Sequence, residues 1–284
     1  MATMTPEELI GDNLKLVSLP EIVAKINQLL NDPNSSAADI AHLVAQDPVL
    51  TARLLKLVNS PFYNFPSQVD TLSMAVTILG TRQLRDLVIA TTVVNHFKSV
   101  DHNFDLETFW CHSITTGLAA RTIALSQNIA NSERLFISGL LHDIGKMIMA
   151  LLLPKETESL NKVNENSNIK IDNPEEQIFG FTHGHLANEL LASWHFPESI
   201  SQPIAHHHTL ACDDEFKTDA SIIHVANVIA NNIQAPISTD DDTILKLEAL
   251  KTLEIEQATV EAYYEEVYSL LDDVLQLLYY DLAA

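Results

Sequence analysis

The chain contains one long apolar stretch, Leu135-Phe-Ile-Ser-Gly-Leu-Leu-His-Asp-Ile-Gly-Lys-Met-Ile-Met-Ala-Leu-Leu-Leu-Pro154, which ends at a proline that cannot continue a helix. We expect this stretch to form one buried helix. Three polar side chains interrupt it: His142, Asp143 and Lys146. Lys146 follows His142 by four residues, so both point the same way on a helix. A buried imidazole beside a buried carboxylate needs partners, which are either hydrogen bonds within the core or a metal ion.

The composition of the 284 residues favours an all-α protein. Apolar residues make up 46%, and there are only seven glycines. Few glycines together with abundant alanine and leucine are typical of helices rather than of β-sandwiches. The formal net charge of −22 repels phosphate backbones and acidic lipid surfaces. We therefore expect no nucleic acid and no membrane among the partners.

The cysteine count and the N-terminus predict a cytoplasmic protein. Cys111 and Cys212 are too few for a disulfide framework, which suits a reducing compartment. The first residues have neither a basic region nor an apolar core, so we read no signal peptide. We expect that no apolar run approaches membrane-spanning length.

Helix-start signals divide the chain into many short helices and leave no convincing strand. The clearest are two capping boxes and one Asp-Pro start: Ser18 with Glu21, Ser36 with Asp39, and Asp47 with Pro48. The aromatic loop Phe62–Pro66 is either a partner surface or a plug folded back onto the bundle. A polar segment near residue 100 predicts two parts, a helical subdomain over residues 1–100 and a second over 101–284. The second ends in a long amphipathic helix from about Ile255 to Leu282.

Histidines and polar residues on separate predicted helices form a candidate metal site. The candidate ligands are His112, His142, Asp143, His183, His207, His208 and Asn227. A helical bundle can direct side chains from several helices to one centre. Imidazole with carboxylate suits divalent iron, zinc, manganese or nickel, and no organic cofactor is indicated. Each residue also has an ordinary alternative: a core histidine, a helix cap, or a solvated helix end.

Specific motifs along the chain resemble the HDOD family, a branch of the HD superfamily of helical proteins. In the N-terminal half they are Leu19-Pro20, Asp47-Pro48, Leu54-Leu-Lys-Leu-Val-Asn-Ser60, Ala75-Val-Thr-Ile-Leu-Gly80 and Leu84-Arg-Asp-Leu87. In the C-terminal half they are Phe109-Trp-Cys-His112, Gly139-Leu-Leu-His-Asp-Ile-Gly-Lys146, Gly180-Phe-Thr-His183, Trp194-His-Phe-Pro197 and His207-His208. The resemblance extends from about residue 15 to 235 and implies a multi-helix bundle of HD type.

The resemblance implies two functions of different kinds. HD-superfamily enzymes are metal-dependent phosphohydrolases, often of nucleotides or cyclic dinucleotides, whereas HDOD members are mostly regulatory modules of bacterial signalling. The candidate ligands match the catalytic pattern except at Asn227, where the superfamily places its last metal-binding aspartate. A neutral amide binds a cation less well than a carboxylate.

The favoured hypothesis is therefore a regulatory protein that acts through a signalling partner or a small phosphorylated ligand. The alternative is a working phosphohydrolase in which a metal activates water, Asp143 holds the metal and Lys146 steadies the phosphate. A third hypothesis is a structural or sensory metal, such as redox-responsive iron.

Overall fold

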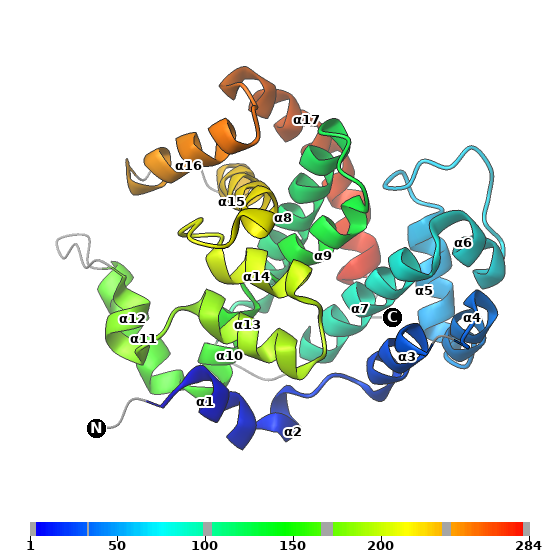
Figure 1. Ribbon diagram of the computed structural model, residues 1–284, viewed down its shortest axis with the longest axis horizontal. Helices are drawn as coiled ribbons and strands as arrows, with labels where there is room; N and C mark the ends of the chain where they lie inside the picture. Colours follow the sequence, from blue (N-terminus) through cyan, green and yellow to red (C-terminus); the bar gives the residue numbers. More distant parts are fainter. Residues whose placement is uncertain (1–3, 33, 99–103, 166–172, 235–239, 281–284) are drawn as a thin grey trace.

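The fold is all-α, as the sequence predicts. A computed structural model describes residues 4–32, 34–98, 104–165, 173–234 and 240–280, and these residues contain no strand (Figure 1). The helices are α1 (Pro6–Asp12), α2 (Leu14–Val17), α3 (Glu21–Asn31), α4 (Ala37–Ala45), α5 (Pro48–Val58), α6 (Leu72–Leu79), α7 (Thr81–Lys98), α8 (Leu106–Ser126), α9 (Ser132–Leu141), α10 (Ile144–Leu152), α11 (Pro154–Glu165), α12 (Pro174–Phe179), α13 (His183–Ser193), α14 (Glu198–His206), α15 (Asp214–Gln234), α16 (Asp240–Thr252) and α17 (Gln257–Leu278).

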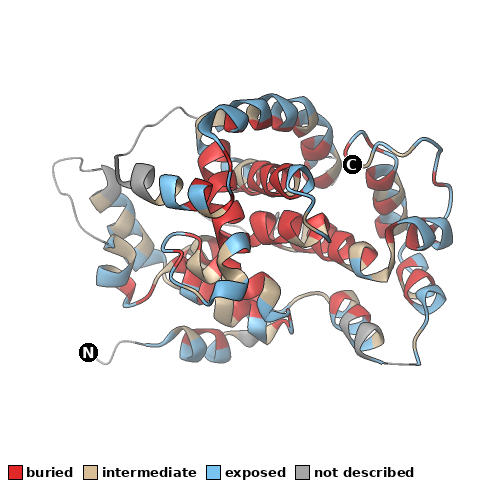
Figure 2. Cartoon of the chain, turned by 45° about the horizontal axis from the view of Figure 1, so that its top comes forward, coloured by how far each residue is buried: buried red, intermediate tan, exposed pale blue. Residues whose placement is uncertain are grey.

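Helices α8 and α9 form the centre of the bundle. Helix α8 packs against α9, α15 and α17, and α9 also contacts α7 and α14. Helices α3 to α6 lie at one end and α11 and α12 at the other, and the central helices carry most of the buried residues (Figures 1 and 2). The predicted boundary between residues 100 and 101 lies outside the described residues, so the division into two subdomains stays a prediction.

The apolar stretch forms two helices instead of the single helix expected. Helix α9 ends at Leu141 and α10 begins at Ile144, so His142 and Asp143 occupy the break. The imidazole Nδ1 of His142 lies 2.7 Å from the carbonyl oxygen of Gly139, and the N–H of Lys146 bonds to the carbonyl of Asp143. These local bonds replace the regular helical ladder at the junction.

The same stretch corrects the expectation about membrane-spanning length. Ser132–Leu152 is long and apolar enough to cross a membrane by length and composition alone, so the prediction that no run reaches this length is wrong. However, 78% of its most apolar window is buried inside the fold, which is the position of a core segment.

Two of the three predicted helix starts are confirmed. Asp39 accepts hydrogen bonds from the backbone and hydroxyl of Ser36, and Asp47 caps α5. The capping box at Ser18 is wrong, because α3 has Pro20 in the cap position. Val17, which ends α2, is fully buried, and its carbonyl accepts a 2.8 Å hydrogen bond from the indole of Trp194 at the end of α13. This bond holds the chain in place just before Ser18 and Pro20.

The aromatic loop folds back onto the bundle at its first residue. Phe62 is buried, and its ring centroid lies 5.2 Å from that of Phe136 on α9. The guanidinium of Arg121 on α8 lies over the Phe62 ring, 4.1 Å from its centroid. Phe62 therefore closes the core between α8 and α9, whereas Pro66 at the end of the loop is exposed.

A buried carboxylate on α7 lies in the same region. Asp86 has no exposed surface, and its Oδ1 pairs with Arg85 at 2.6 Å. Its other oxygen has no hydrogen-bond partner among the described residues. Burial raises the pKa of Asp86 to about 6, against the opposing effect of Arg85. Because the folded pKa lies above the usual value, the contribution of Asp86 to stability is present below about pH 4 and is lost as pH rises through 6.

We expect Asp86→Asn to remove this pH dependence. Relative to the variant, the wild type should lose about 2–3 kcal/mol of unfolding free energy between pH 4 and pH 8. Denaturant unfolding at a series of pH values measures this difference, with Asp70→Asn at an exposed carboxylate as the control. A constant difference between wild type and Asp86→Asn across this range would contradict the assignment.

Candidate metal centre

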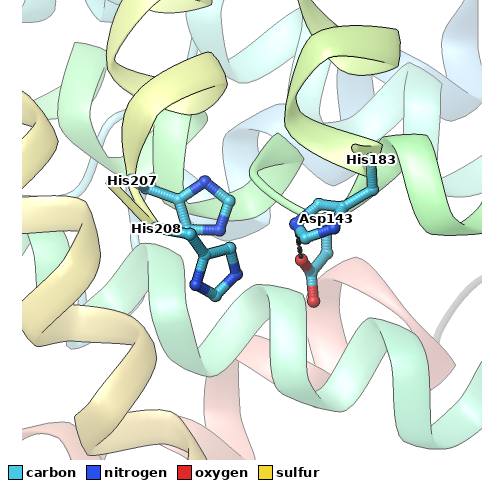
Figure 3. Close-up of side chains that lie close together, drawn as sticks. All are labelled: Asp143, His183, His207 and His208. Carbon is cyan, nitrogen blue, oxygen red and sulfur yellow. Dashed lines mark ion pairs between the residues drawn. The ribbon is translucent and has the colours of Figure 1, made fainter. Parts of the chain in front are cut away.

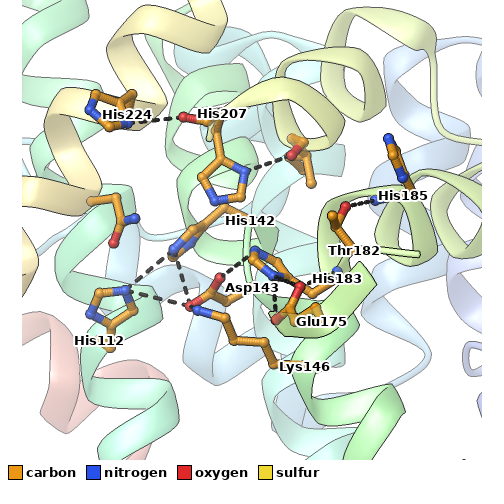
Figure 4. Close-up of polar contacts among 12 residues, drawn as sticks. His112, His142, Asp143, Lys146, Glu175, Thr182, His183, His185, His207 and His224 are labelled. Carbon is orange, nitrogen blue, oxygen red and sulfur yellow. Dashed lines mark hydrogen bonds and ion pairs between the residues drawn. The ribbon is translucent and has the colours of Figure 1, made fainter. Parts of the chain in front are cut away.

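The predicted ligands come together at the middle of the bundle from five places in the chain. His112 lies on α8, and His142 and Asp143 occupy the break between α9 and α10. His183 is the first residue of α13, which Thr182 caps by accepting from the N–H of His185. The remaining candidates are His207 and His208 just after α14, and Asn227 on α15. Figure 4 shows the polar contacts that join most of them.

The carboxylate of Asp143 is shared between two groups of histidines. Its Oδ2 lies 3.4 Å from His142 Nε2 and 3.7 Å from His112 Nε2. Its Oδ1 lies 3.2 Å from His183 Nε2 on the other side. One set of candidate ligands is thus His112, His142 and Asp143, and the other is Asp143, His183, His207 and His208 (Figure 3). In each set the ligand atoms lie within 4.8 Å of one another.

Close backbone contacts between helices bring these side chains together. A Cβ added to Gly139 on α9 would lie 2.8 Å from the Cα of Gly117 on α8, so the two helices touch there. One turn away, the Nε2 atoms of His112 and His142 are 3.3 Å apart. At Gly145 on α10 an added Cβ would lie 2.0 Å from the carbonyl oxygen of His183. Glycine at these positions lets the ligand-bearing helices approach.

Buried polar atoms that lack partners point to a metal ion. His207 Nε2 is buried and has no hydrogen-bond partner in the described part of the chain, and the buried Asp143 Oδ1 and His183 Nε2 have only each other, as an ion pair at 3.2 Å. Such atoms are costly unless something binds them. The Nδ1 atoms of His142 and His207 are already used, at 2.7 Å from Gly139 O and 2.6 Å from Ile204 O. Bonds at Nδ1 leave the Nε2 lone pairs directed into the site, as metal ligation requires.

The protonation states suit a metal as well. Burial lowers the pKa of His142 to about 3, so its imidazole is neutral at physiological pH. Burial alone would raise the pKa of Asp143, but the neighbouring Lys146 and His183 hold it well below its usual range. The Nζ of Lys146 lies 2.8 Å from Asp143 Oδ2. Neutral imidazoles and an ionised carboxylate are the forms that bind divalent cations, so these residues fit the ion.

Sequence reasoning missed one residue that supports this set. Glu175 on α12 accepts a hydrogen bond from the backbone N–H of His183 at 2.7 Å and lies 2.8 Å from its Nδ1. Burial would lower the pKa of His183, but the carboxylates of Asp143 and Glu175 raise it. Glu175 precedes His183 by eight residues in another helix, and no spacing pattern links them. Its place just after Pro174, at a helix start, was the only local signal.

A cleft leads from solvent to the ligands. Its cavity volume is about 420 Å³, and Asn227 lies in its wall with Oδ1 accepting a 3.3 Å bond from Asn231. The lining residues are Phe104, Asp105, Thr108, Phe109, His112, Asp143, Lys146, His208, Asn227, Asn231 and Gln234. The sequence analysis named His112, Asp143, Lys146, His208 and Asn227 as site residues and Phe109 as part of a family motif, and it did not single out the other lining residues. The cleft gives a small molecule direct access to Asp143 and Lys146.

Comparison with known proteins settles the family. The family model described as HDOD domain matches residues 16–210. The chain belongs to the HDOD domain family. The matched region of this HDOD protein includes the candidate ligands from His112 to His208 and ends before Asn227.

Known proteins resemble this HDOD protein at low sequence identity. An uncharacterised protein from Treponema pallidum (strain Nichols) is 27% identical over 215 residues, which cover 74% of this chain and 41% of that protein. The chain thus spans about two fifths of this curated relative. An HDOD domain protein of unknown function from Geobacter sulfurreducens has a TM-score of 0.74 at 23% identity, with 96% and 98% of the two chains covered. A candidate phosphohydrolase from Shewanella amazonensis SB2B has a TM-score of 0.71 at 23% identity, with 92% and 93% covered.

We expect Glu175→Gln to weaken metal binding about 10- to 100-fold, because the amide no longer fixes the His183 ring as a charged acceptor does. Titration of chelator-treated protein with Mn²⁺ or Zn²⁺, followed by calorimetry, measures the affinity. Glu176→Gln is the matched control, since Glu176 is the next residue and is exposed. Equal affinities of the two variants would show that Glu175 does not support the ligand.

Proposed function

We propose that this HDOD protein binds a divalent metal ion at Asp143, that the metal holds the phosphate of a small ligand, and that this binding regulates a signalling partner. The observation that carries the proposal is the carboxylate of Asp143, which is shared between two histidine groups, together with the buried His207 Nε2, which has no hydrogen-bond partner among the described residues.

The charge of the site favours an anionic ligand. Asp143 is the only carboxylate among the candidate ligands, and the others are imidazoles and one amide. A divalent ion together with Lys146 outweighs this single negative charge. Lys146 is 40% exposed, and both it and Asp143 line the cleft, so a phosphate entering there meets the excess positive charge. Iron, zinc, manganese and nickel all suit this donor set.

Asn227 favours regulation over turnover. A carboxylate at this position would supply a second negative ligand to the His112 group, whereas the amide of Asn227 is neutral and already accepts from Asn231. The metal is therefore held by fewer charges than in a site with two carboxylates. The N-terminal helices α3 to α6, which supply no candidate ligand, are the proposed surface for a protein partner. A cytoplasmic location is part of the proposal, and the acidic composition with two cysteines supports it.

Phosphohydrolase activity is the second candidate, and one contact favours it. Lys146 lies within 2.8 Å of Asp143 at the edge of the cleft, where it can bind a phosphoryl oxygen while Asp143 orients the ion. A bound divalent metal supplies an acidified water and polarises the phosphoryl group. A structural relative is a candidate phosphohydrolase, and at 23% identity this supports the fold and only motivates the activity test.

We expect Asp143→Ala to abolish metal binding, because it removes the only carboxylate of both ligand sets. Elemental analysis of protein purified without chelator should find about one or two equivalents of metal in the wild type and none in the variant. The melting temperature of the wild type should rise with added Mn²⁺, and that of Asp143→Ala should not. A wild type that stays metal-free after reconstitution would overturn the proposal.

The two candidate functions separate in a paired assay on the metal-loaded protein. Calorimetry with inorganic phosphate measures binding, and release of p-nitrophenol from p-nitrophenyl phosphate measures turnover. Phosphate binding without turnover at any metal concentration supports regulation. Turnover that disappears in Asp143→Ala supports the phosphohydrolase.

We expect Asn227→Asp to strengthen metal binding by roughly tenfold, because it adds a carboxylate beside the His112 group. If the site can hydrolyse phosphoesters, turnover should rise as well. Asn231→Asp is the matched control, since it adds the same charge one helical turn farther along α15, and it should have the smaller effect. Equal gains in the two variants would mean that the added charge acts only at long range.

A further inference from the structure

Beyond the metal ligands, one wall of the cleft is a row of carboxamides on α15. Asn227, Asn231 and Gln234 are spaced by four and three residues, so they lie on one face of the helix. Asn227 and Gln234 both face His112, and Asn231 donates to Asn227 at 3.3 Å. The row therefore borders the metal centre, and the side chains of Asn231 and Gln234 are also exposed to solvent.

The opposite wall is the start of α8. Asp105 caps this helix, with its Oδ1 3.1 Å from the N–H of Thr108 and its Oδ2 2.7 Å from the Thr108 hydroxyl. Phe104 is partly exposed beside it and packs on Phe109 with ring centroids 5.4 Å apart. This wall offers an aromatic face, a hydroxyl and hydrogen-bond acceptors, but no positive charge.

The two ends of the cleft thus differ in charge. Lys146 and the metal ligands mark the inner end as the place for a phosphate. The outer walls carry neutral amides that can both donate and accept hydrogen bonds. Vicinal hydroxyl groups on an uncharged ring match such amides, whereas a second phosphate finds no cation there among the lining residues.

The size of the cleft limits the ligand further. Its volume of about 420 Å³ is near the lower end of the range of roughly 300–1,000 Å³ usual for small-molecule sites. One phosphorylated ring fits within this space. Because the cleft is open to solvent, its discrimination against cyclic dinucleotides rests on charge, since the lining residues offer no cation for a second phosphate.

We propose that the cleft recognises a sugar monophosphate, with the phosphate at Lys146 and the metal ligands and the ring hydroxyls on Asn231 and Gln234. The proposal rests on the proposed function, since it assigns the organic part of a ligand whose phosphate that function already places. Asn231 and Gln234 are specificity residues and do not hold the metal.

Calorimetry on the full chain loaded with Mn²⁺ tests this assignment. The probes are inorganic phosphate, ribose 5-phosphate, adenosine 5′-monophosphate and a cyclic dinucleotide. We expect ribose 5-phosphate to bind at least tenfold more tightly than inorganic phosphate, and the cyclic dinucleotide to bind more weakly than both. Adenosine 5′-monophosphate carries the same sugar phosphate and should bind within about tenfold of ribose 5-phosphate.

Two variants locate the recognition. Asn231→Leu and Gln234→Leu should each weaken ribose 5-phosphate binding roughly fivefold more than they weaken binding of inorganic phosphate, the effect of one lost hydrogen bond. The ratio of the two affinities cancels any change that the variants cause at the metal through Asn227 or His112. Gln257→Leu is the matched control, because Gln257 is exposed at the start of α17 and is not among the cleft residues.

The outcomes separate this inference from the proposed function. If inorganic phosphate fails to bind the metal-loaded protein, the proposed function fails and this inference with it. If phosphate binds but ribose 5-phosphate binds no better, or both variants match Gln257→Leu, only the sugar assignment is overturned. Adenosine 5′-monophosphate binding more than tenfold tighter than ribose 5-phosphate would overturn it too, since the base would then be the recognised group.

Discussion

The burial of one carboxylate, Asp143, is the constraint on which the rest of the structure depends. An ionised group in the centre of a helical bundle is stable only if cations or hydrogen-bond donors surround it. Lys146 supplies a cation from the next turn, the adjacent His142 presents a ring nitrogen, and His112 and His183 do so from other helices. The buried centre of the bundle therefore contains a cluster of polar side chains.

The helix geometry follows from this arrangement. A continuous helix through residues 135–153 would carry His142 and Asp143 on adjacent positions about 100° apart, where one side chain faces the centre and the other turns away. The break between α9 and α10 lets both face the same space, and the contact of Gly139 with Gly117 brings α8 close enough for His112 to join them. The site therefore forms where the helix breaks within the most apolar segment of the chain. Hydrogen bonds of His142 and Lys146 stabilise this break.

The outer contacts determine how the site can be used. Glu175 holds His183 from the side of α12, and the amides of α15 line the approach from solvent. Glu175 on α12 orients His183, a candidate ligand of the ion. The amides of α15 provide neutral hydrogen-bonding groups for the organic part of an anionic ligand. Asn227 connects the metal centre with the row of amides, because it faces His112 and accepts a hydrogen bond from Asn231. The residue that departs from the catalytic pattern is thus also the one that joins the centre to the cleft.

The sequence by itself determined the helical class, the family and the candidate ligands, because apolar periodicity, caps such as Ser36 with Asp39, and short motifs around His142 are local properties. It could not give the break at His142 and Asp143, because their apolar neighbours favour a continuous helix, and the contacts with α8 and α13 that help to stabilise the break are not visible in the sequence. It also could not give Glu175 or the cleft wall, since these residues act across helices far apart in the chain. Tertiary structure alone decided how the single carboxylate of Asp143 is shared, because that depends on which faces of five segments meet.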